Sequence, residues 1–193
     1  MATAFQGGLA ILGCFLSWLI GVDSIAKMEF SVYPVLQGIA GSIPMLMIFA
    51  VTYRFPLGPL KTIKFFLLEA LGPPLAACRW YDLTWVALLA GVSEELMFRG
   101  VIQSWFSPWG SSLGILVSNI LFGLAHAITP TYAILAASMG VYLGVVYEYV
   151  GDQNLIVPIV THSFYDLVAF IVVRRGFIQE QRCQPTVPAD SSA

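Results

Sequence analysis

The sequence predicts an all-α fold, a polytopic transmembrane helical bundle of about six spans. Composition and the spacing of apolar stretches carry this prediction. Of the 193 residues, 58% are hydrophobic and only 10% are charged, whereas soluble domains are about 25% charged. A helical span needs about 20 predominantly apolar residues, and stretches of near that length recur along the chain, separated by charged or turn-forming residues. We therefore expect the chain to lie in a bilayer.

The apolar stretches give the order of the elements. The first begins near Gly7 without a basic leader, so we expect a retained span rather than a signal peptide. The stretch 54–82 holds several basic residues and paired prolines, which predicts a loop with a short amphipathic helix near residues 61–71. The expected spans cover residues 7–22, 32–53, 83–102, 111–127, 132–150 and 155–173.

Three regions follow from this division. Residues 1–82 hold the N-terminal spans and the amphipathic loop, residues 83–176 hold the core that carries the polar motifs, and residues 177–193 are expected to be a disordered tail. Six spans place both termini on one side, where the basic residues of the loop and the tail collect, and the positive-inside tendency makes that side cytoplasmic. The plasma membrane is expected for a bacterial chain, with an internal or organellar membrane left open.

Charge and cysteine content exclude some partners. The formal net charge is −2 and no basic stripe is present, so we expect no nucleic-acid partner. The three cysteines are scattered, which predicts neither a disulfide framework nor a cysteine-rich metal site. The expected partners are membrane lipid and a membrane-associated protein or peptide.

A pair of carboxylates stands within the expected third span. An ionisable side chain in hydrocarbon costs a few kcal/mol or more, so such residues are functional candidates. Neighbours on a helix point about 100° apart, so Glu94 and Glu95 are not expected to face one centre, whereas Glu95 and Arg99 lie one turn apart on one face. We predict that Glu95 pairs with Arg99 and that Glu94 is free. A neutralised polar cluster is the alternative for the pair.

The two histidines, His126 and His162, also lie in apolar stretches. Phe122 precedes His126 by one helical turn and can pack against its ring, and Asp166 follows His162 by one turn and can accept from it. Each histidine alone suits ordinary hydrogen-bonded packing. Together with a free carboxylate they supply a base, a second polar group and a donor, the set needed to activate water and stabilise an oxyanion.

The three motifs occur in a fixed order on successive polar-bearing helices: Glu94-Glu95-x-x-x-Arg99, Phe122-x-x-x-His126 and His162-x-x-x-Asp166. This ordered set resembles the CPBP (also called Abi) family, the type II CAAX prenyl endopeptidases and the bacterial proteins related to bacteriocin processing and immunity. The resemblance covers about residues 83–173 and leaves the first two spans unaccounted for. It implies an intramembrane glutamic endopeptidase that acts on a membrane-associated or lipidated CAAX-type protein.

The resemblance also implies roles for the motif residues. Glu94 would be the general base, His126 would hold the water with it, and His162 and Asp166 would supply the oxyanion site. The family more commonly has asparagine where this chain has Asp166. An ionised aspartate only accepts hydrogen bonds, so Asp166 is either protonated or orients His162, and we favour orientation.

Other functions fit parts of the pattern. Two histidines and a glutamate can form a zinc site with an open position, but H-E-x-x-H spacing is absent and the resemblance indicates a mechanism without metal or cofactor. A non-catalytic membrane scaffold or immunity protein would use the polar cluster as interhelical hydrogen bonds. A transporter would use it as a proton relay, although no internal repeat is visible.

Overall fold

The computed structural model describes residues 2–183, and within them every regular element is a helix, so the all-α prediction is confirmed. The α-helices are α1 (Ala2–Ile20), α2 (Val32–Arg54), α3 (Pro59–Phe66), α4 (Gly72–Ala77), α5 (Trp80–Glu95), α6 (Ser104–Phe106), α7 (Ser111–Ala125), α8 (Pro130–Val145) and α9 (Ile156–Cys183). Three π-helical segments, η1 (Leu67–Leu71), η2 (Leu96–Gln103) and η4 (Val146–Val150), and a 3₁₀ turn, η3 (Ser107–Trp109), continue or join them.

Four helices are long and apolar enough to cross a membrane: Thr3–Ile20, Val32–Arg54, Pro130–Val150 and Ile156–Cys183. The other two expected spans are also helical, but they do not meet the length and polarity limits for a candidate span. The run α5–η2–α6 is long enough but carries Glu94, Glu95 and Arg99, and α7 has 15 residues, fewer than a typical span. The expected membrane bundle is therefore present, with a span count close to six.

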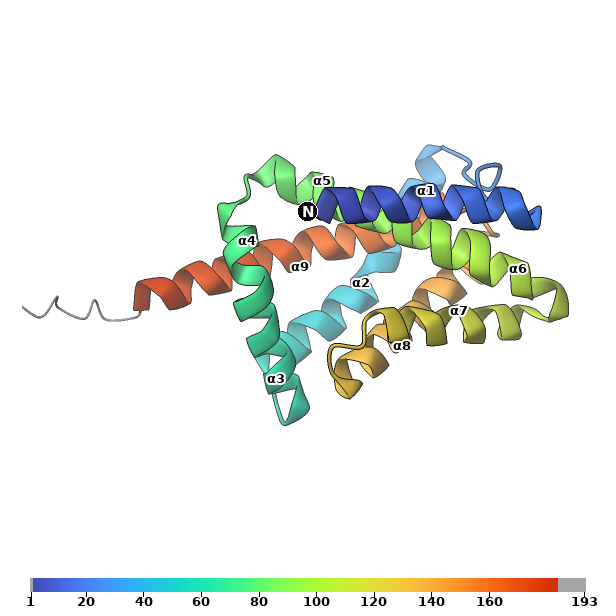
Figure 1. The fold of residues 1–193 in the computed structure, drawn as a ribbon. Helices are drawn as coiled ribbons and strands as arrows, with labels where there is room; N and C mark the ends of the chain where they lie inside the picture. Colours follow the sequence, from blue (N-terminus) through green and yellow to red (C-terminus); the bar gives the residue numbers. More distant parts are fainter. Residues whose placement is uncertain (1, 184–193) are drawn as a thin grey trace, which may run out of the picture.

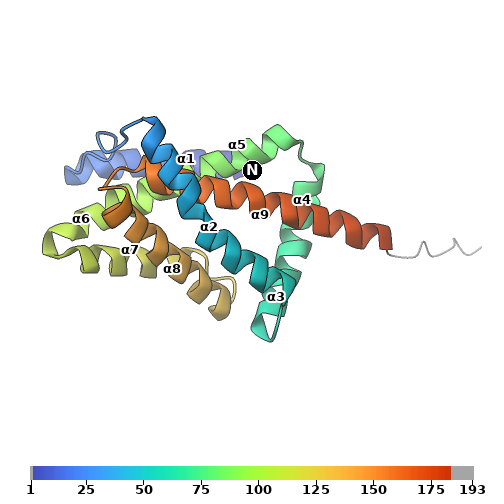
Figure 2. The ribbon, with the colours of Figure 1, turned by 180° about the vertical axis from the view of Figure 1, so that it is seen from behind.

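Helix α9 is the central element of the bundle, and α2, α4 and α5 pack against it (Figures 1 and 2). Helix α1 lies along α5 and η2, at the edge of the bundle (Figure 1). Helices α7 and α8 form a hairpin, and α7 also contacts η2. The run α5–η2 thus lies between α1, α9 and the α7–α8 hairpin, and the residues of its second half face all three.

Glycines permit the close packing around α9. A Cβ added at Gly91 of α5 would collide with Ser163 Oγ and stand 3.0 Å from the carbonyl oxygen of Ile159. A Cβ at Gly38 of α2 would stand 2.8 Å from the carbonyl oxygen of Val157. Small residues let helix backbones approach closely in membranes. As a result, the stretch of α9 around His162 is held between α5 and α2.

Two expectations about connecting segments are corrected. Helix α9 continues to Cys183, so residues 177–183 are helical rather than part of a disordered tail, and the remaining residues, 184–193, lie outside the described part of the chain. Phe177 packs in the apolar cluster with Leu75 and Val173, which explains why the helix does not end at residue 173. The stretch 54–82 is mostly helix, from Pro59 to Ala77, because Pro73 and Pro74 fall in the first turn of α4, where their missing N–H groups cost little.

Candidate active site

The polar residues of α5 and η2 face a buried network that joins four helices. Arg99 is fully buried; its Nη1 donates to Glu95 Oε1 at 2.9 Å, and its Nη2 donates to Asn119 Oδ1 at 2.9 Å and to the Gly140 carbonyl oxygen at 2.7 Å. The guanidinium also lies 5.0 Å from the centre of the Phe122 ring. The structure therefore contains the ion pair that the i, i+4 spacing of Glu95 and Arg99 predicts.

His162 lies between the two adjacent carboxylates. Its Nδ1 is 2.7 Å from Glu95 Oε1, and its Nε2 is 3.9 Å from Glu94 Oε2. The expectation that the two glutamates cannot serve one centre is therefore wrong, because an imidazole between the helices presents one nitrogen to each of them. Asp166 Oδ2 is 3.6 Å from Nε2, beyond hydrogen-bond distance, so Glu95 rather than Asp166 holds the ring in the structure.

His126 reaches the same carboxylate from the C-terminal end of α7. It is the C-cap residue of that helix, its Nδ1 is 2.8 Å from the Phe122 carbonyl oxygen, and its ring stacks on Phe122 with the centres 4.3 Å apart. Its Nε2 is 3.8 Å from Glu94 Oε2. The side chain is 28% exposed, whereas that of His162 is 8% exposed.

Glu94 is the point at which these groups meet. Its Oε1 accepts a 2.9 Å hydrogen bond from Gln6 Nε2, whereas its Oε2 is buried and has no hydrogen-bond partner within residues 2–183. That oxygen faces the Nε2 atoms of both histidines. The carboxylate therefore has one oxygen held by the protein and one oxygen free to bind a small polar molecule.

The hydrogen-bond partners of the two rings fix their tautomers when they are neutral. The Phe122 carbonyl oxygen can only accept, so Nδ1 of His126 carries the proton. An ionised Glu95 beside Arg99 likewise only accepts, so Nδ1 of His162 carries the proton. In both neutral rings Nε2 is then the unprotonated nitrogen. The two rings and the free oxygen of Glu94 are then three acceptors, and a water molecule, with two donors, can bridge Glu94 Oε2 and one of the two rings.

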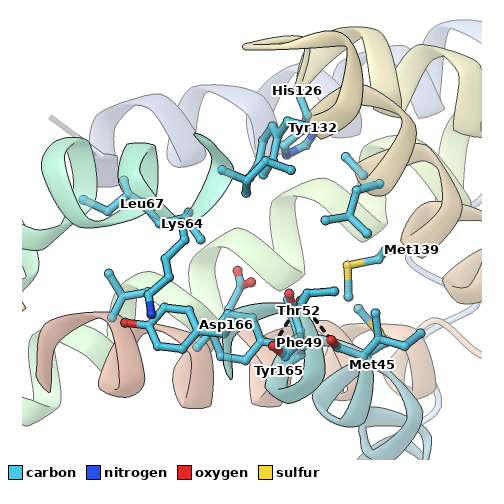
Figure 3. Close-up of a pocket in the computed structure, with 18 of the residues that line it drawn as sticks. Met45, Phe49, Thr52, Lys64, Leu67, His126, Tyr132, Met139, Tyr165 and Asp166 are labelled. Carbon is cyan, nitrogen blue, oxygen red and sulfur yellow. Dashed lines mark hydrogen bonds between the residues drawn. The ribbon is translucent and has the colours of Figure 1, made fainter. Parts of the chain in front are cut away.

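A largely apolar cavity of about 160 Å³ opens beside this centre. Side chains of α2, α3, η1, α8 and α9 line it, including Phe49, Leu67 and Met139 (Figure 3). The titratable groups on its wall are Lys64, His126, His162 and Asp166, with Tyr53, Tyr132 and Tyr165. Figure 3 shows His126 and Asp166 on different sides of the space, with Lys64 extending from α3 toward it. An apolar chain inside this cavity would reach the histidines.

Among residues 2–183, no group of three or more histidine, cysteine, aspartate or glutamate side chains is placed to hold a metal ion. The zinc alternative is therefore left to a direct test.

Three polar contributors were missed in the sequence. Asn119 and the Gly140 carbonyl oxygen complete the shell of Arg99, and Gln6 holds Glu94. Asn119 could have been noticed, because an amide inside an apolar stretch needs a partner. Gln6 has no helical spacing to any motif, and a backbone carbonyl leaves no mark in a sequence, so neither was predictable.

Comparison with known protein families finds one match. A family model described as type II CAAX prenyl endopeptidase Rce1-like matches residues 76–168. The predicted resemblance is confirmed. The match associates this Rce1-like segment with CAAX-type membrane proteases, and it contains the three motifs but not Gln6. No curated protein and no solved structure matches the chain.

Proposed function

We propose that this protein is an intramembrane endopeptidase that hydrolyses a peptide bond in a membrane-associated or lipidated, CAAX-type protein. One observation carries the proposal. Glu94 Oε2 is buried, has no protein partner, and lies within 4 Å of Nε2 of both histidines. A carboxylate held in this way is suited to general-base catalysis, and burial strengthens its interaction with any group placed beside it.

The first step is activation of water by Glu94. Separations of 3.8 and 3.9 Å are too long for direct hydrogen bonds but allow one water oxygen to contact Glu94 Oε2 and a histidine Nε2 together. Glu94 removes a proton as the water oxygen bonds to the carbonyl carbon of the substrate. His126, whose ring is fixed by Phe122, holds the same water in position.

The second step is collapse of the tetrahedral intermediate. We take His162 to be doubly protonated before the substrate binds, so that its Nδ1 donates to Glu95 and its Nε2 donates to the oxyanion, while neutral His126 accepts from the water. The C–N bond then breaks, and the proton taken by Glu94 passes to the departing amine. The products are one new carboxyl terminus and one new amino terminus. Asp166, on the same face of α9, lies 3.6 Å from Nε2, where its carboxylate would stabilise the charge of the imidazolium without taking its hydrogen bond.

The cavity beside the centre is proposed to take an apolar part of the substrate. Its wall is mostly apolar, and Met139 of α8 lies on it (Figure 3). We expect Met139→Trp to raise KM about tenfold with little change in kcat, because the larger side chain would fill space that the substrate occupies. A tenfold rise in KM corresponds to about 1.4 kcal/mol of lost binding free energy. Ile134→Trp, on the exposed side of the same helix, is the control and should leave KM unchanged.

The test of the activity is a comparison of peptide termini. Membrane fractions from cells that carry the native protein and from cells that carry Glu94→Ala at matched abundance are analysed for new termini. Termini that depend on Glu94 would support the peptidase and identify its substrates. Identical termini across several growth conditions would overturn the proposal and favour the membrane scaffold, with the polar network holding helices together.

A further inference from the structure

Helix α1 contributes a polar side chain to the site from outside the segment that the family model matches. Gln6 Nε2 donates to Glu94 Oε1 at 2.9 Å, and Ser93 Oγ donates to Gln6 Oε1 at 2.5 Å. We propose that Gln6 is a positioning residue that fixes the Glu94 carboxylate for attack by water. This inference rests on the proposed peptidase function and adds α1 to its machinery.

The orientation of the Gln6 amide follows from its two neighbours. An ionised carboxylate only accepts hydrogen bonds, so the NH₂ group of Gln6 must face Glu94. The amide oxygen then faces Ser93, whose hydroxyl group is a donor. The reverse orientation would place two acceptors against each other at Glu94. The carboxylate of Glu94 therefore fixes the orientation of the Gln6 amide, and Ser93 holds the other end of that amide.

The consequence for catalysis is that the two oxygens of Glu94 are no longer equivalent. Oε1 is held by Gln6, and Oε2 is left toward His126 and His162. Without Gln6, the carboxylate would have a second buried oxygen without a partner and could rotate about its terminal bond. A displacement of about 1 Å in a reacting group costs roughly 100-fold in rate, so a single orienting hydrogen bond matters at this position.

The fit of α1 to the bundle makes the contact possible. A Cβ at Gly13 would lie 3.4 Å from the Leu96 side chain, so this face of α1 lies closely against η2. In Figure 1, α1 runs along α5 with its N-terminal end beside that helix. Ser17, one turn beyond Gly13, contacts Ser24, whose hydroxyl donates to the Gly100 carbonyl oxygen. Contacts at both ends of α1 thus hold Gln6 against Glu94.

The first measurement is steady-state kinetics of the full-length protein in proteoliposomes, on a substrate identified from Glu94-dependent termini. We expect Gln6→Leu to lower kcat at least tenfold with KM within about twofold of the native value. Gln6→Glu keeps the shape but removes the donor and adds a like charge, so it should lower kcat further. Ser93→Ala should give a smaller loss. Gln37→Leu, which removes a glutamine bonded to the Val150 carbonyl oxygen, is the matched control and should leave kcat unchanged.

The second measurement does not depend on turnover. A hydrophobic carbodiimide labels buried carboxyl groups, and the rate at which it labels Glu94 can be followed by mass spectrometry. We expect Gln6→Leu to label at least threefold faster than the native protein and Gln37→Leu to label at the native rate. Equal labelling of Gln6→Leu and native protein, or kcat within twofold of native for Gln6→Leu, would overturn the positioning role.

The two proposals fail in different ways. Cleavage that requires Glu94 but survives Gln6→Leu would overturn the role of Gln6 and leave the peptidase intact. Absence of cleavage by the native protein would overturn the peptidase itself, and the positioning role with it. A large rise in KM with unchanged kcat would show that α1 acts on substrate binding, which also contradicts the inference.

Discussion

Glu94 and Glu95 are neighbours in the sequence, yet their environments are different. Both oxygens of the Glu95 side chain are buried, and its Oε1 contacts Arg99 and His162 at 2.9 and 2.7 Å. Glu94 has one oxygen bonded to Gln6 and one that meets two histidines only at 3.8 and 3.9 Å. Each carboxylate has a buried Oε2 atom without a hydrogen-bond partner among residues 2–183. The two differ in their neighbours: Arg99 and His162 hold Glu95 directly, whereas Oε2 of Glu94 faces two histidines that line the cavity.

Under the proposed function, the same helical run carries a structural carboxylate and a catalytic carboxylate one residue apart. Charges in hydrocarbon persist when they are paired and hydrogen-bonded, and Arg99 with Asn119 and Gly140 meets that condition. The same network then holds His162 through Glu95. In this view the network around Glu95 stabilises the fold and orients the His162 ring, and Glu94 performs the proposed chemistry.

The sharpest way to break this comparison is Glu94→Gln. The amide has the shape of the carboxylate but cannot take a proton, so we expect kcat to fall about 10²- to 10⁴-fold, or roughly 3 to 5 kcal/mol in the barrier. The free energy of unfolding should change little, because the amide keeps the shape of the carboxylate and its oxygen can still accept the hydrogen bond from Gln6. Kinetics and reversible unfolding in detergent measure the two effects. Substantial activity in Glu94→Gln would contradict the assignment of the base.

A comparable effect on stability, rather than on chemistry, is expected from Arg99→Met. Loss of one partner leaves Glu95 buried with an uncompensated charge, which costs about 3 to 5 kcal/mol. The double variant Glu95→Leu/Arg99→Met removes both charges and should recover part of that loss while activity stays low, because His162 loses its partner. Unfolding that is unaffected by Arg99→Met would remove the structural half of the comparison.

A smaller effect is expected from Asp166→Asn. Because Glu95 holds the His162 ring at 2.7 Å and Asp166 lies at 3.6 Å, kcat should stay within about threefold of native, or roughly 0.6 kcal/mol. The kcat of Glu95→Gln serves as the reference, because this variant alters the direct hydrogen-bond partner of the His162 ring. A fall of tenfold or more in Asp166→Asn would show that Asp166, and not Glu95, governs the ring.

No effect at all is expected from metal removal. Since no three suitable side chains converge on an ion within residues 2–183, treatment with 1,10-phenanthroline should leave kcat unchanged, and added zinc should not raise it. Inactivation by the chelator followed by recovery with zinc would contradict metal-free activation of water by Glu94 and would support the zinc alternative.

The structure also shows how Glu94, His126 and His162 can meet although they lie at different positions along their helices. Glu94 and His126 fall late in helices that run in opposite directions, and His162 falls early in its own. His126 lies at the end of the short helix α7, only 15 residues long, so its ring is not carried to the far side of the bundle. Close approach of α5 and α9 at Gly91 then places His162 between the glutamates.

The sequence alone determined the all-α membrane bundle, because a high apolar fraction in stretches of span length leaves few other folds. It also predicted the motif residues and the pairing of Glu95 with Arg99, since helical periodicity makes contacts between residues one turn apart a local property.

Only the tertiary structure decided what depends on contacts between separate helices. These are the placement of His162 against Glu95, the contact of Gln6 with Glu94, the cavity beside them and the extension of α9 to Cys183. The physical reason is that such contacts are set by helix packing and close approach at glycines, and neither the distance between helices nor their rotation is encoded in a local spacing.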